Sequence, residues 1–460
     1  MNIEKLNSVY FVGIGGIGMS AIARYFNAMG KEIYGYDRVR TAFTSQLENE
    51  GMEIVYTDAA NAVSPDFLSY NPQSTLVVYT PAVPLTHPGL NLLKARGYLV
   101  LKRSEILSEI IEKQKTVAIA GTHGKTTTSA MTAHILINGG VKTNAFLGGI
   151  ALNYNSNVVL NAEAQYAVAE ADEYDRSFLK LNPYAAIITS AEPDHLDIYG
   201  NASIMRQAYQ DFANKVNPSG IVFMHLGVGL SANAGIKTYD LTNIEADLHT
   251  QNLQIENGAY VFDVIYNKMN LGTVKSSYPG HHNVENMLAA IGVAIELGVK
   301  WDKIVEGVLS FSGVKRRFEY HVKQPHCVYI DDYAHHPTEI AACVNSVKEL
   351  YPNQRVTGVF QPHLYSRTRD FGDEFARSLE LLNELLLMEI YPAREEPIPG
   401  IDSNWLLNKI RMVNKKLVNR ENVIDEVLKL QPEVLLTMGA GDIDKLVEPL
   451  KSAINEEKGE

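Results

Sequence analysis

The chain has 460 residues, which is too long for one ordinary hydrophobic core and predicts about two to four domains. Apolar residues make up 46% and charged residues 20%, while the net charge of -12 argues against nucleic-acid binding and against insertion into or adsorption to anionic membranes. The cysteines Cys327 and Cys343 have no metal-like spacing, and residues 1–10 lack a signal-peptide pattern, so we expect a cytoplasmic protein.

The first predicted unit, residues 1–106, opens with a buried strand at Val9–Val12 and a helix over about Met19–Met29. Between them lies the glycine turn Gly13-Ile14-Gly15-Gly16-Ile17-Gly18, where the backbone can approach a pyrophosphate at the helix N-terminus. Asp37 follows the next predicted strand, where a carboxylate can hold a ribose hydroxyl. This pattern is typical of Rossmann dehydrogenases that bind NAD(P). The alternative is a glycine turn that is required only for packing.

The second predicted unit, residues 107–313, restarts with a strand at Thr116–Ala120 and a helix over about Thr127–Asn138. The loop between them reads Gly121-Thr122-His123-Gly124-Lys125-Thr126-Thr127. Its N–H groups can cradle phosphates, Lys125 can neutralise phosphate oxygens, and the Thr126 hydroxyl can reach Mg²⁺. Ile119 stands where the strict Walker pattern has its first glycine, but the flanking strand and helix favour an ATP-binding loop over a chance match.

Two acidic segments, Glu170-Ala171-Asp172-Glu173 and Glu192-Pro193-Asp194-His195-Leu196-Asp197, follow later predicted strands of this unit. Mg²⁺ that bridges ATP phosphates needs hard oxygen ligands. A lone acidic cluster is usually a solvated loop, but the neighbouring ATP loop favours metal binding here. His195 is either a metal ligand or a hydrogen-bonding loop residue.

Two further features complete the second unit. Short alternating segments between about Lys237 and Lys275 predict antiparallel strands. The segment His281-His282-Asn283-Val284-Glu285-Asn286 then opens a helix that runs to about Leu297. Its amides either read adenine edges or cap the helix.

The third predicted unit, residues 314–460, contains strands that are each followed by a polar loop: Cys327–Ile330, Val356–Phe360, Leu385–Ile390 and Val434–Thr437. Ligands of open parallel sheets bind at the carboxyl ends of strands, so these loops are either a binding site or ordinary solvated loops. Guanidinium, imidazole and carboxylate groups concentrate in Arg316–Glu319, Asp331–Pro337 and Gln361–Arg367. Their spacing matches no standard metal site, and it favours contacts with substrate and nucleotide.

These motifs, in this order, resemble the Mur ligase family over essentially the whole chain, and they are most similar to its alanine-adding branch. The resemblance is carried by Gly13–Ser20 (GIGGIGMS), Gly121–Thr128 (GTHGKTTT), Glu170–Glu173 (EADE), Glu192–Asp197 (EPDHLD), Asp331–Glu339 (DDYAHHPTE) and Gln361–Thr368 (QPHLYSRT). It implies an α/β protein of three domains. These are a Rossmann-like N-terminal domain, a central P-loop ATPase-type domain with a parallel sheet, and a C-terminal Rossmann-like α/β domain.

The resemblance also implies site residues. UDP-N-acetylmuramate, rather than NAD, would be held by Gly13, Gly15, Gly16, Ile17, Gly18 and Asp37. ATP would be held by Gly121, Thr122, His123, Gly124, Lys125, Thr126, Thr127, Asn283, Asn286, Arg317 and Asp332. Mg²⁺ or Mn²⁺ would be held by Thr126, Glu170 and His195, and catalysis would depend on Lys125, His195 and Arg317. The pocket for L-alanine would be lined by Tyr333, His336, His363 and Arg367.

The implied reaction activates the lactyl carboxylate of UDP-N-acetylmuramate as an acyl phosphate and joins it to alanine in peptidoglycan precursor synthesis. The alternatives are a sister ligase that attaches a recycled tripeptide, an NAD(P)-dependent oxidoreductase, and a non-catalytic nucleotide-dependent regulator. Three positions depart from the family pattern. Leu364 replaces an arginine of some members, Ser190-Ala191 replace Asn-Ile as an expected packing variation, and Gln210 stands where sister ligases carry a carbamylated lysine.

Overall fold

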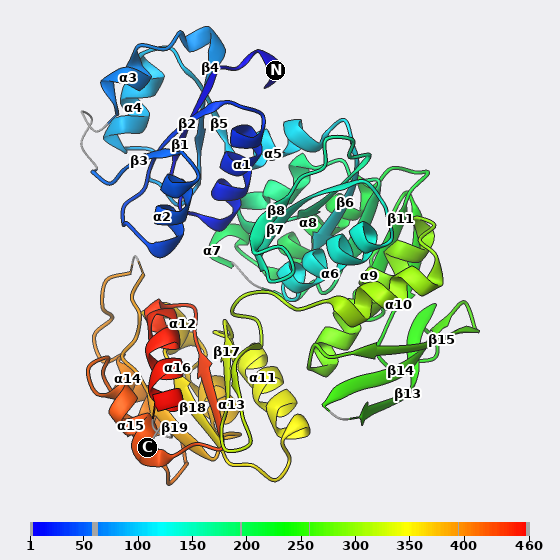
Figure 1. Ribbon diagram of the computed structural model, residues 1–460, viewed down its shortest axis with the longest axis vertical. Helices are drawn as coiled ribbons and strands as arrows, with labels where there is room; N and C mark the ends of the chain where they lie inside the picture. Colours follow the sequence, from blue (N-terminus) through cyan, green and yellow to red (C-terminus); the bar gives the residue numbers. More distant parts are fainter. Residues whose placement is uncertain (1–2, 58–62, 194–195, 257, 394, 457–460) are drawn as a thin grey trace. The chain divides into compact units, whose positions relative to one another are not determined.

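The computed structural model describes residues 3–57, 63–193, 196–256, 258–393 and 395–456, and it contains sheets of five, ten and six strands in chain order (Figure 1). The chain forms two compact units. The first comprises Met1–Leu253, Val261–Lys275 and Glu285–Ser312, and the second comprises Gln254–Tyr260, Ser276–Val284 and Gly313–Glu460. No helix within the described ranges has both the length and the apolar character needed to cross a membrane.

The N-terminal sheet is parallel and has the order β3-β2-β1-β4-β5. Its strands are β1 (Ser8–Val12), β2 (Glu32–Tyr36), β3 (Glu53–Val55), β4 (Thr75–Tyr79) and β5 (Leu99–Lys102). Its helices are α1 (Ile17–Ala28), α2 (Ala42–Asn49), α3 (Pro65–Leu68), α4 (Pro88–Ala95) and α5 (Arg103–Ile111). All five positions of β1 are buried, as expected for an apolar run in the centre of a parallel sheet. Val12 pairs with Tyr36, so Gly13 and Asp37 emerge at the same edge.

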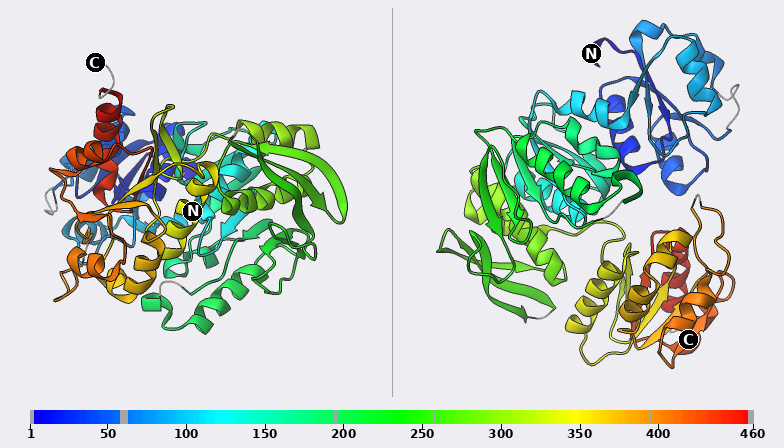
Figure 2. Two further views of the ribbon diagram at one scale, coloured as in Figure 1. Left: turned by 90° about the horizontal axis from the view of Figure 1, so that it is seen from below. Right: turned by 180° about the vertical axis from the view of Figure 1, so that it is seen from behind.

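The central sheet has the order β15-β14-β13-β12-β11-β10-β6-β9-β7-β8. Its strands are β6 (Lys115–Ala120), β7 (Thr143–Ala151), β8 (Ser156–Val159), β9 (Tyr166–Glu170), β10 (Ala185–Ile188), β11 (Ile221–His225), β12 (Gly235–Tyr239), β13 (Leu248–Glu256), β14 (Ala259–Tyr266) and β15 (Met269–Ser276). Its helices, which cover both faces of the sheet (Figure 2), are α6 (Lys125–Asn138), α7 (Leu196–Tyr199), α8 (Ala202–Asn214), α9 (His281–Glu296) and α10 (Trp301–Ser310).

The centre of this sheet brings the predicted nucleotide segments to one edge. Strand β6 is parallel to both β9 and β10, and its residue Ile119 pairs with Glu170 while Ala120 pairs with Ile188. The phosphate loop, the first acidic segment and the residues after β10 therefore all begin at the carboxyl ends of adjacent parallel strands, where open sheets bind ligands.

The antiparallel pairing predicted from Lys237 onward is wrong for β12. This strand pairs in parallel with β11, and its bridge from Tyr239 to Leu248 of β13 is also parallel. Alternation of apolar and polar residues marks a strand with one exposed face, and it does not distinguish the two pairing directions. Strands β13, β14 and β15 are neighbours both along the chain and in the sheet.

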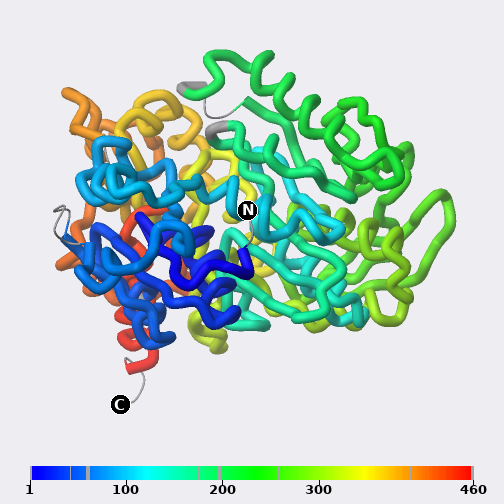
Figure 3. The backbone as a smooth tube through the Cα atoms, turned by 90° about the horizontal axis from the view of Figure 1, so that it is seen from above, coloured from blue at the N-terminus to red at the C-terminus, as the bar shows by residue number. Residues whose placement is uncertain are grey.

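One hydrophobic cluster joins the first two sheets. It extends from Phe11 and Phe26 of the N-terminal domain to Phe146 and Phe212 of the central domain. At this junction the rings of Tyr25 and Phe146 lie 5.9 Å apart. This shared core explains why both domains form one unit, whose backbone Figure 3 follows from blue to green.

The C-terminal sheet has the order β16-β17-β21-β18-β19-β20, and only β16 is antiparallel to its neighbour. Its strands are β16 (Glu319–Lys323), β17 (Val328–Asp332), β18 (Val356–Phe360), β19 (Glu384–Leu387), β20 (Lys415–Leu417) and β21 (Val434–Met438). Its helices are α11 (Pro337–Leu350), α12 (Tyr365–Asp370), α13 (Gly372–Leu379), α14 (Ser403–Lys409), α15 (Val423–Leu430) and α16 (Val447–Glu456). The four expected strands are confirmed as β17, β18, β19 and β21, so their polar loops share one edge.

Candidate active site

The phosphate loop depends on two glycines whose backbone few other residues could adopt. Gly121 has a φ of +136°, and a Cβ there would lie 2.0 Å from Thr189 Oγ1. Gly124 has a φ of +80°, and a Cβ there would lie 2.6 Å from Asn286 Oδ1 of α9. Left-handed backbone and close neighbours both exclude a side chain. The structure thus brings Asn286, expected to contact adenine, against the phosphate loop.

Lys125 lies partly buried at the first turn of α6. Its Nζ donates hydrogen bonds to the carbonyl oxygens of Gly121 (2.6 Å) and Thr122 (3.3 Å) and to Glu173 Oε1 (2.8 Å). Burial alone lowers the pKa of Lys125, but the carboxylates of Glu173 and Glu170 outweigh burial and raise it. Lys125 is therefore a cation at neutral pH, as stabilisation of a transferred phosphoryl group requires.

Two hard oxygen donors lie beside Lys125. Thr126 Oγ1 donates a hydrogen bond of 3.0 Å to Glu170 Oε1. Gly148 leaves room for this carboxylate, because a Cβ there would lie 1.6 Å from Glu170 Oε2. A hydroxyl and a carboxylate in contact suit Mg²⁺, which prefers oxygen ligands. The third expected metal ligand, His195, lies outside the described residues.

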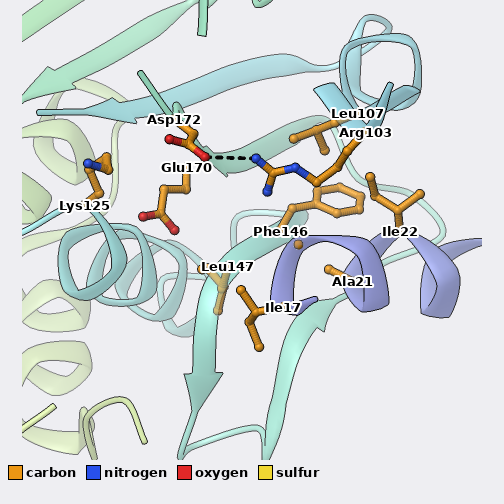
Figure 4. Close-up of a pocket in the computed structure, with 12 residues that line it drawn as sticks. Ile17, Ala21, Ile22, Arg103, Leu107, Lys125, Phe146, Leu147, Glu170 and Asp172 are labelled. Carbon is orange, nitrogen blue, oxygen red and sulfur yellow. Dashed lines mark hydrogen bonds and ion pairs between the residues drawn. The ribbon is translucent and has the colours of Figure 1, made fainter. Parts of the chain in front are cut away.

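A cavity of about 190 Å³ connects this region with the start of α1 (Figure 4). Lys125, Glu170 and Asp172 contribute to its polar lining, and Arg103 of α5 faces them. Arg103 Nη2 donates a hydrogen bond of 3.0 Å to Asp172 Oδ2. Gly18 makes room for this arginine, because a Cβ there would lie 2.1 Å from Arg103 Nη1.

The three carboxylates of the Glu170–Glu173 segment therefore have three different partners. Glu170 contacts Thr126, Asp172 pairs with Arg103, and Glu173 pairs with Lys125. The sequence identified Glu170 alone as a functional residue and missed the other two acids and Arg103. The sequence of this segment does not indicate which partner each carboxylate contacts.

Three hydrogen bonds hold the phosphate loop against the segment after β10. Thr189 Oγ1 donates to the carbonyl of His123, and Thr122 Oγ1 donates to the carbonyl of Glu192 over 2.8 Å. Ser190 Oγ accepts a hydrogen bond of 3.2 Å from the His123 N–H. The pair Ser190-Ala191 was expected to be a packing variation, and the structure adds that the Ser190 hydroxyl binds the loop directly.

The second helix amide has a local role. Asn283 is buried, and its Nδ2 donates a hydrogen bond of 2.6 Å to the carbonyl of Pro279. The side chain donates here, whereas an N-cap accepts from helix N–H groups, so this contact ties the start of α9 to the preceding loop and does not test the capping alternative. An adenine contact of Asn283 stays a prediction.

In the second unit, Arg317 and Asp332 lie around Tyr333. The guanidinium carbon of Arg317 is 5.0 Å from the centre of the Tyr333 ring. Asp332 accepts backbone hydrogen bonds of 2.7 Å from Phe318 and from Ala334. Burial raises the pKa of Asp332 from 3.8 to about 6, and Arg317 opposes this shift.

Most of the expected amino-acid residues form one cluster. His363 Nδ1 lies 3.4 Å from Arg367 Nη1, and the His363 ring is 6.1 Å from that of His335. His335 in turn lies 5.2 Å from the Tyr333 ring. The fourth expected residue, His336, caps α11 and packs on Phe371 at 4.9 Å. His335 was not selected from the sequence, although it belongs to the same motif.

Leu364, which precedes α12, has a φ of +71°. Positive φ is unfavourable for a residue with a branched side chain, and such backbone often occurs at functional sites. The chain therefore keeps a strained turn between His363 and Arg367 without the arginine that some family members carry.

A group of metal-ligating residue types, His225, Asp240 and Glu285, lies at the ends of β11 and β12 and in α9. His225 Nδ1 accepts a hydrogen bond of 3.2 Å from the Gly227 N–H. The proton of the neutral ring must then be on Nε2, which faces Glu285 Oε1 at 3.2 Å and Asp240 Oδ2 at 3.7 Å. In the described structure the three residues form a hydrogen-bonded group, and the hydrogen bond with Glu285 raises the pKa of His225.

Family models of the Mur ligases match the chain in succession. The catalytic-domain model of the Mur ligase family matches residues 8–115, the Mur ligase middle domain matches residues 119–294, and the glutamate ligase domain matches residues 316–441. The chain belongs to the Mur ligase family and is an ATP-dependent amide-bond-forming ligase. The boundaries expected at residues 106 and 313 stay predictions.

Two relatives and one solved structure are similar along their whole length. The chain is 47% identical over 458 residues to the UDP-N-acetylmuramate–L-alanine ligase of Parabacteroides distasonis, covering 99% of this chain and 98% of the relative. It is 46% identical over 456 residues to the enzyme of that name from Cytophaga hutchinsonii, covering 98% and 97%. The crystal structure of the UDP-N-acetylmuramate–alanine ligase from Thermotoga maritima superposes with a TM-score of 0.84 at 27% identity, covering 98% and 100%. The expected three-domain α/β fold is confirmed.

Proposed function

We propose that this protein joins L-alanine to the lactyl carboxylate of UDP-N-acetylmuramate, with ATP as the second substrate, in the cytoplasmic synthesis of peptidoglycan precursors. The observation that carries the proposal is a charged, partly buried Lys125 beside the Thr126–Glu170 oxygen pair. The whole-length relatives named for the alanine reaction support the choice of amino acid over the tripeptide of the sister ligase.

In the first step, a lactyl carboxylate oxygen attacks the γ-phosphorus of ATP. The new oxygen–phosphorus bond forms as the bond between the γ-phosphorus and the β–γ bridging oxygen breaks, and ADP leaves. Lys125 stabilises the charge on the transferred group, and the amides of the phosphate loop hold the remaining phosphates. The product is an acyl phosphate.

In the second step, the neutral amine of alanine attacks the acyl carbon. The resulting tetrahedral intermediate expels inorganic phosphate, and the nitrogen loses a proton. Phosphate is a far better leaving group than the original carboxylate oxygen, which is why activation comes first. The Arg367 guanidinium beside His363 suits the carboxylate of alanine.

Thr126 and Glu170, together with His195 by resemblance, are the residues that would hold Mg²⁺ or Mn²⁺. The ion would supply positive charge to the phosphate oxygens of ATP. Thr126 follows Lys125 directly at the start of α6, so the ammonium group and the Thr126 hydroxyl come from one helix turn, while Glu170 comes from the end of β9.

The test is ligation by Lys125→Ala, with Lys113→Ala as the control because Lys113 is an exposed lysine. The substrates are ATP, UDP-N-acetylmuramate and L-alanine, and mass spectrometry follows the ligated product. We expect Lys125→Ala to lose roughly a thousandfold or more in rate, since it removes a cation that stabilises the transferred phosphoryl group. A Lys125→Ala enzyme that kept more than about a tenth of the wild-type rate would show that this loop is not the ATP site.

A further inference from the structure

The ammonium group of Lys125 has three hydrogens, and the chain itself supplies three acceptors for them. Two are carbonyl oxygens of the phosphate loop, from Gly121 and Thr122, at 2.6 and 3.3 Å. The third is Glu173 Oε1 at 2.8 Å. A phosphate oxygen that is to bind Lys125 must therefore displace one of these acceptors.

The loop carbonyls are poor candidates for displacement because they belong to the same short turn as Lys125 itself. Glu173 approaches from a different segment, 48 positions along the chain. It is also the one anion among the three acceptors, so a phosphate oxygen competes with it most directly for the ammonium charge.

The Glu173 carboxylate is buried, so its contact with Lys125 is costly to break. Its side chain is only 1% exposed, and among the described residues no group donates a hydrogen bond to Oε2. The backbone of Glu173 is fixed independently, since its carbonyl accepts hydrogen bonds from Tyr199 Oη and from the Arg176 N–H. Loss of Lys125 would therefore leave a buried carboxylate without its cation, which is a cost that ATP binding has to overcome.

From this geometry we propose that Glu173 is a positioning residue that competes with the phosphate oxygens of ATP for Lys125. The proposal rests on the proposed role of Lys125 in ATP binding. In the free protein Glu173 neutralises the lysine and directs it to the loop. In the complex it must give up Lys125, and this exchange lowers the affinity for ATP.

The experiment has to separate the effect of removing a negative charge from the effect of removing the Lys125–Glu173 contact. Asp172 is the adjacent acid and carries the same charge, but it pairs with Arg103 over 3.0 Å. Asp172→Asn therefore removes one negative charge from the same region while leaving the Lys125–Glu173 contact in place. It is the matched control for Glu173→Gln.

The experiment is calorimetric titration of ATP into wild-type protein and variants, in saturating Mg²⁺ and without the nucleotide sugar, so that no ligation occurs. We expect Glu173→Gln to lower the Kd for ATP about tenfold, the factor expected for one charge-assisted hydrogen bond. Asp172→Asn should lower it clearly less. Glu173→Asp keeps the charge but shortens the reach, and it should also tighten binding, which preserves the test if the glutamine variant does not fold.

The outcomes are distinct. A purely structural role for Glu173 would leave ATP affinity unchanged or weaken it on substitution, and either result overturns the proposal. An equal gain in Glu173→Gln and Asp172→Asn would also overturn it, since charge alone would then be the cause. If wild-type protein bound no ATP, or if Lys125→Ala bound it equally well, the proposed ATP role of Lys125 would fail instead.

Discussion

Asp37 accepts a hydrogen bond from the backbone N–H of Gly15, with Oδ2 at 2.7 Å from the nitrogen. The carboxylate from the end of β2 therefore lies directly over the glycine turn that precedes α1. Gly15 cannot carry a side chain in this arrangement, because a Cβ would lie 2.8 Å from the same oxygen. The glycine turn and the acidic residue, which the sequence related to ligand binding separately, form one unit.

This relationship predicts the ligand preference of the N-terminal domain. Gly15→Ala should push Asp37 away and weaken binding of UDP-N-acetylmuramate about tenfold or more. The affinity for ATP should stay unchanged, because ATP is proposed to bind the separate Gly121–Thr127 loop. Calorimetric titration of the wild type and the variant with the nucleotide sugar, ATP and NAD provides the measurement. Micromolar binding of NAD, with none for the nucleotide sugar, would overturn the proposed substrate.

Arg367 provides a test of the amino-acid pocket. Arg367→Ala should raise the KM for L-alanine about tenfold or more, because it removes a charged partner of the substrate carboxylate, and it should leave the KM for ATP nearly unchanged. Arg369→Ala is the control, since Arg369 is on the same helix, is exposed and pairs only locally with Asp370 at 2.7 Å. Steady-state kinetics with each substrate varied in turn decide the matter. Equal increases in both constants would mean that Arg367 does not contact alanine selectively.

Asp332 predicts a pH-dependent contribution to stability. Its pKa is raised from 3.8 to about 6 in the folded protein by burial, so the folded state holds this proton more tightly than the unfolded state. The favourable contribution is complete below about pH 4 and is lost as the pH rises through about 6. A rise of two pKa units corresponds to at most about 3 kcal/mol, and less where water reaches the partly exposed carboxylate.

Urea unfolding of the wild type and Asp332→Asn between pH 4 and pH 7 measures this effect. The free energy of unfolding of the wild type should fall relative to that of the variant as the pH rises. The amide of the variant, like the protonated acid, offers one acceptor oxygen to the N–H groups of Phe318 and Ala334, and it does so at every pH. A difference between the two proteins that does not change with pH would contradict the raised pKa.

Gln210 predicts activity without a carbamylated lysine. Its Nε2 donates to the Ser231 carbonyl at 2.7 Å and its Oε1 accepts from the Ser231 N–H at 3.1 Å, so both ends of the amide are used to hold a loop. Ligation should be insensitive to CO₂ depletion, and peptides containing Lys215 from native protein should have unmodified mass. An inactive Lys215→Ala enzyme that regained activity with a short-chain carboxylate would show that a carbamate is used.

The strands and the phosphate loop could be predicted from the sequence because their signals are local. An apolar run followed by glycine placed β1 and β6 within about one residue of Val9–Val12 and Thr116–Ala120. The family could be predicted because six separate strings occur in the same order. The pairing direction of β12 could not, since alternation is common to both kinds of sheet.

The side-chain partners within the site could not be predicted for a different reason. Arg103 and Asp172 are 69 positions apart, and no local pattern relates an arginine at the start of α5 to a particular carboxylate after β9. Likewise, three acids in four positions give no indication that Glu173, and not Glu170, contacts Lys125. The backbone after β9 turns successive side chains in different directions, and only the fold determines which cation each one meets.

The most direct test of the central claim is release of inorganic phosphate from ATP in the presence of UDP-N-acetylmuramate and one amino donor at a time. The donors are L-alanine, glycine, L-serine and the tripeptide used by the sister ligase. We expect L-alanine to support the fastest release, with one ligated product formed for each phosphate released. Release that depended on the tripeptide and not on alanine would contradict the proposed acceptor, and the absence of release with every donor would contradict the ligase reaction itself.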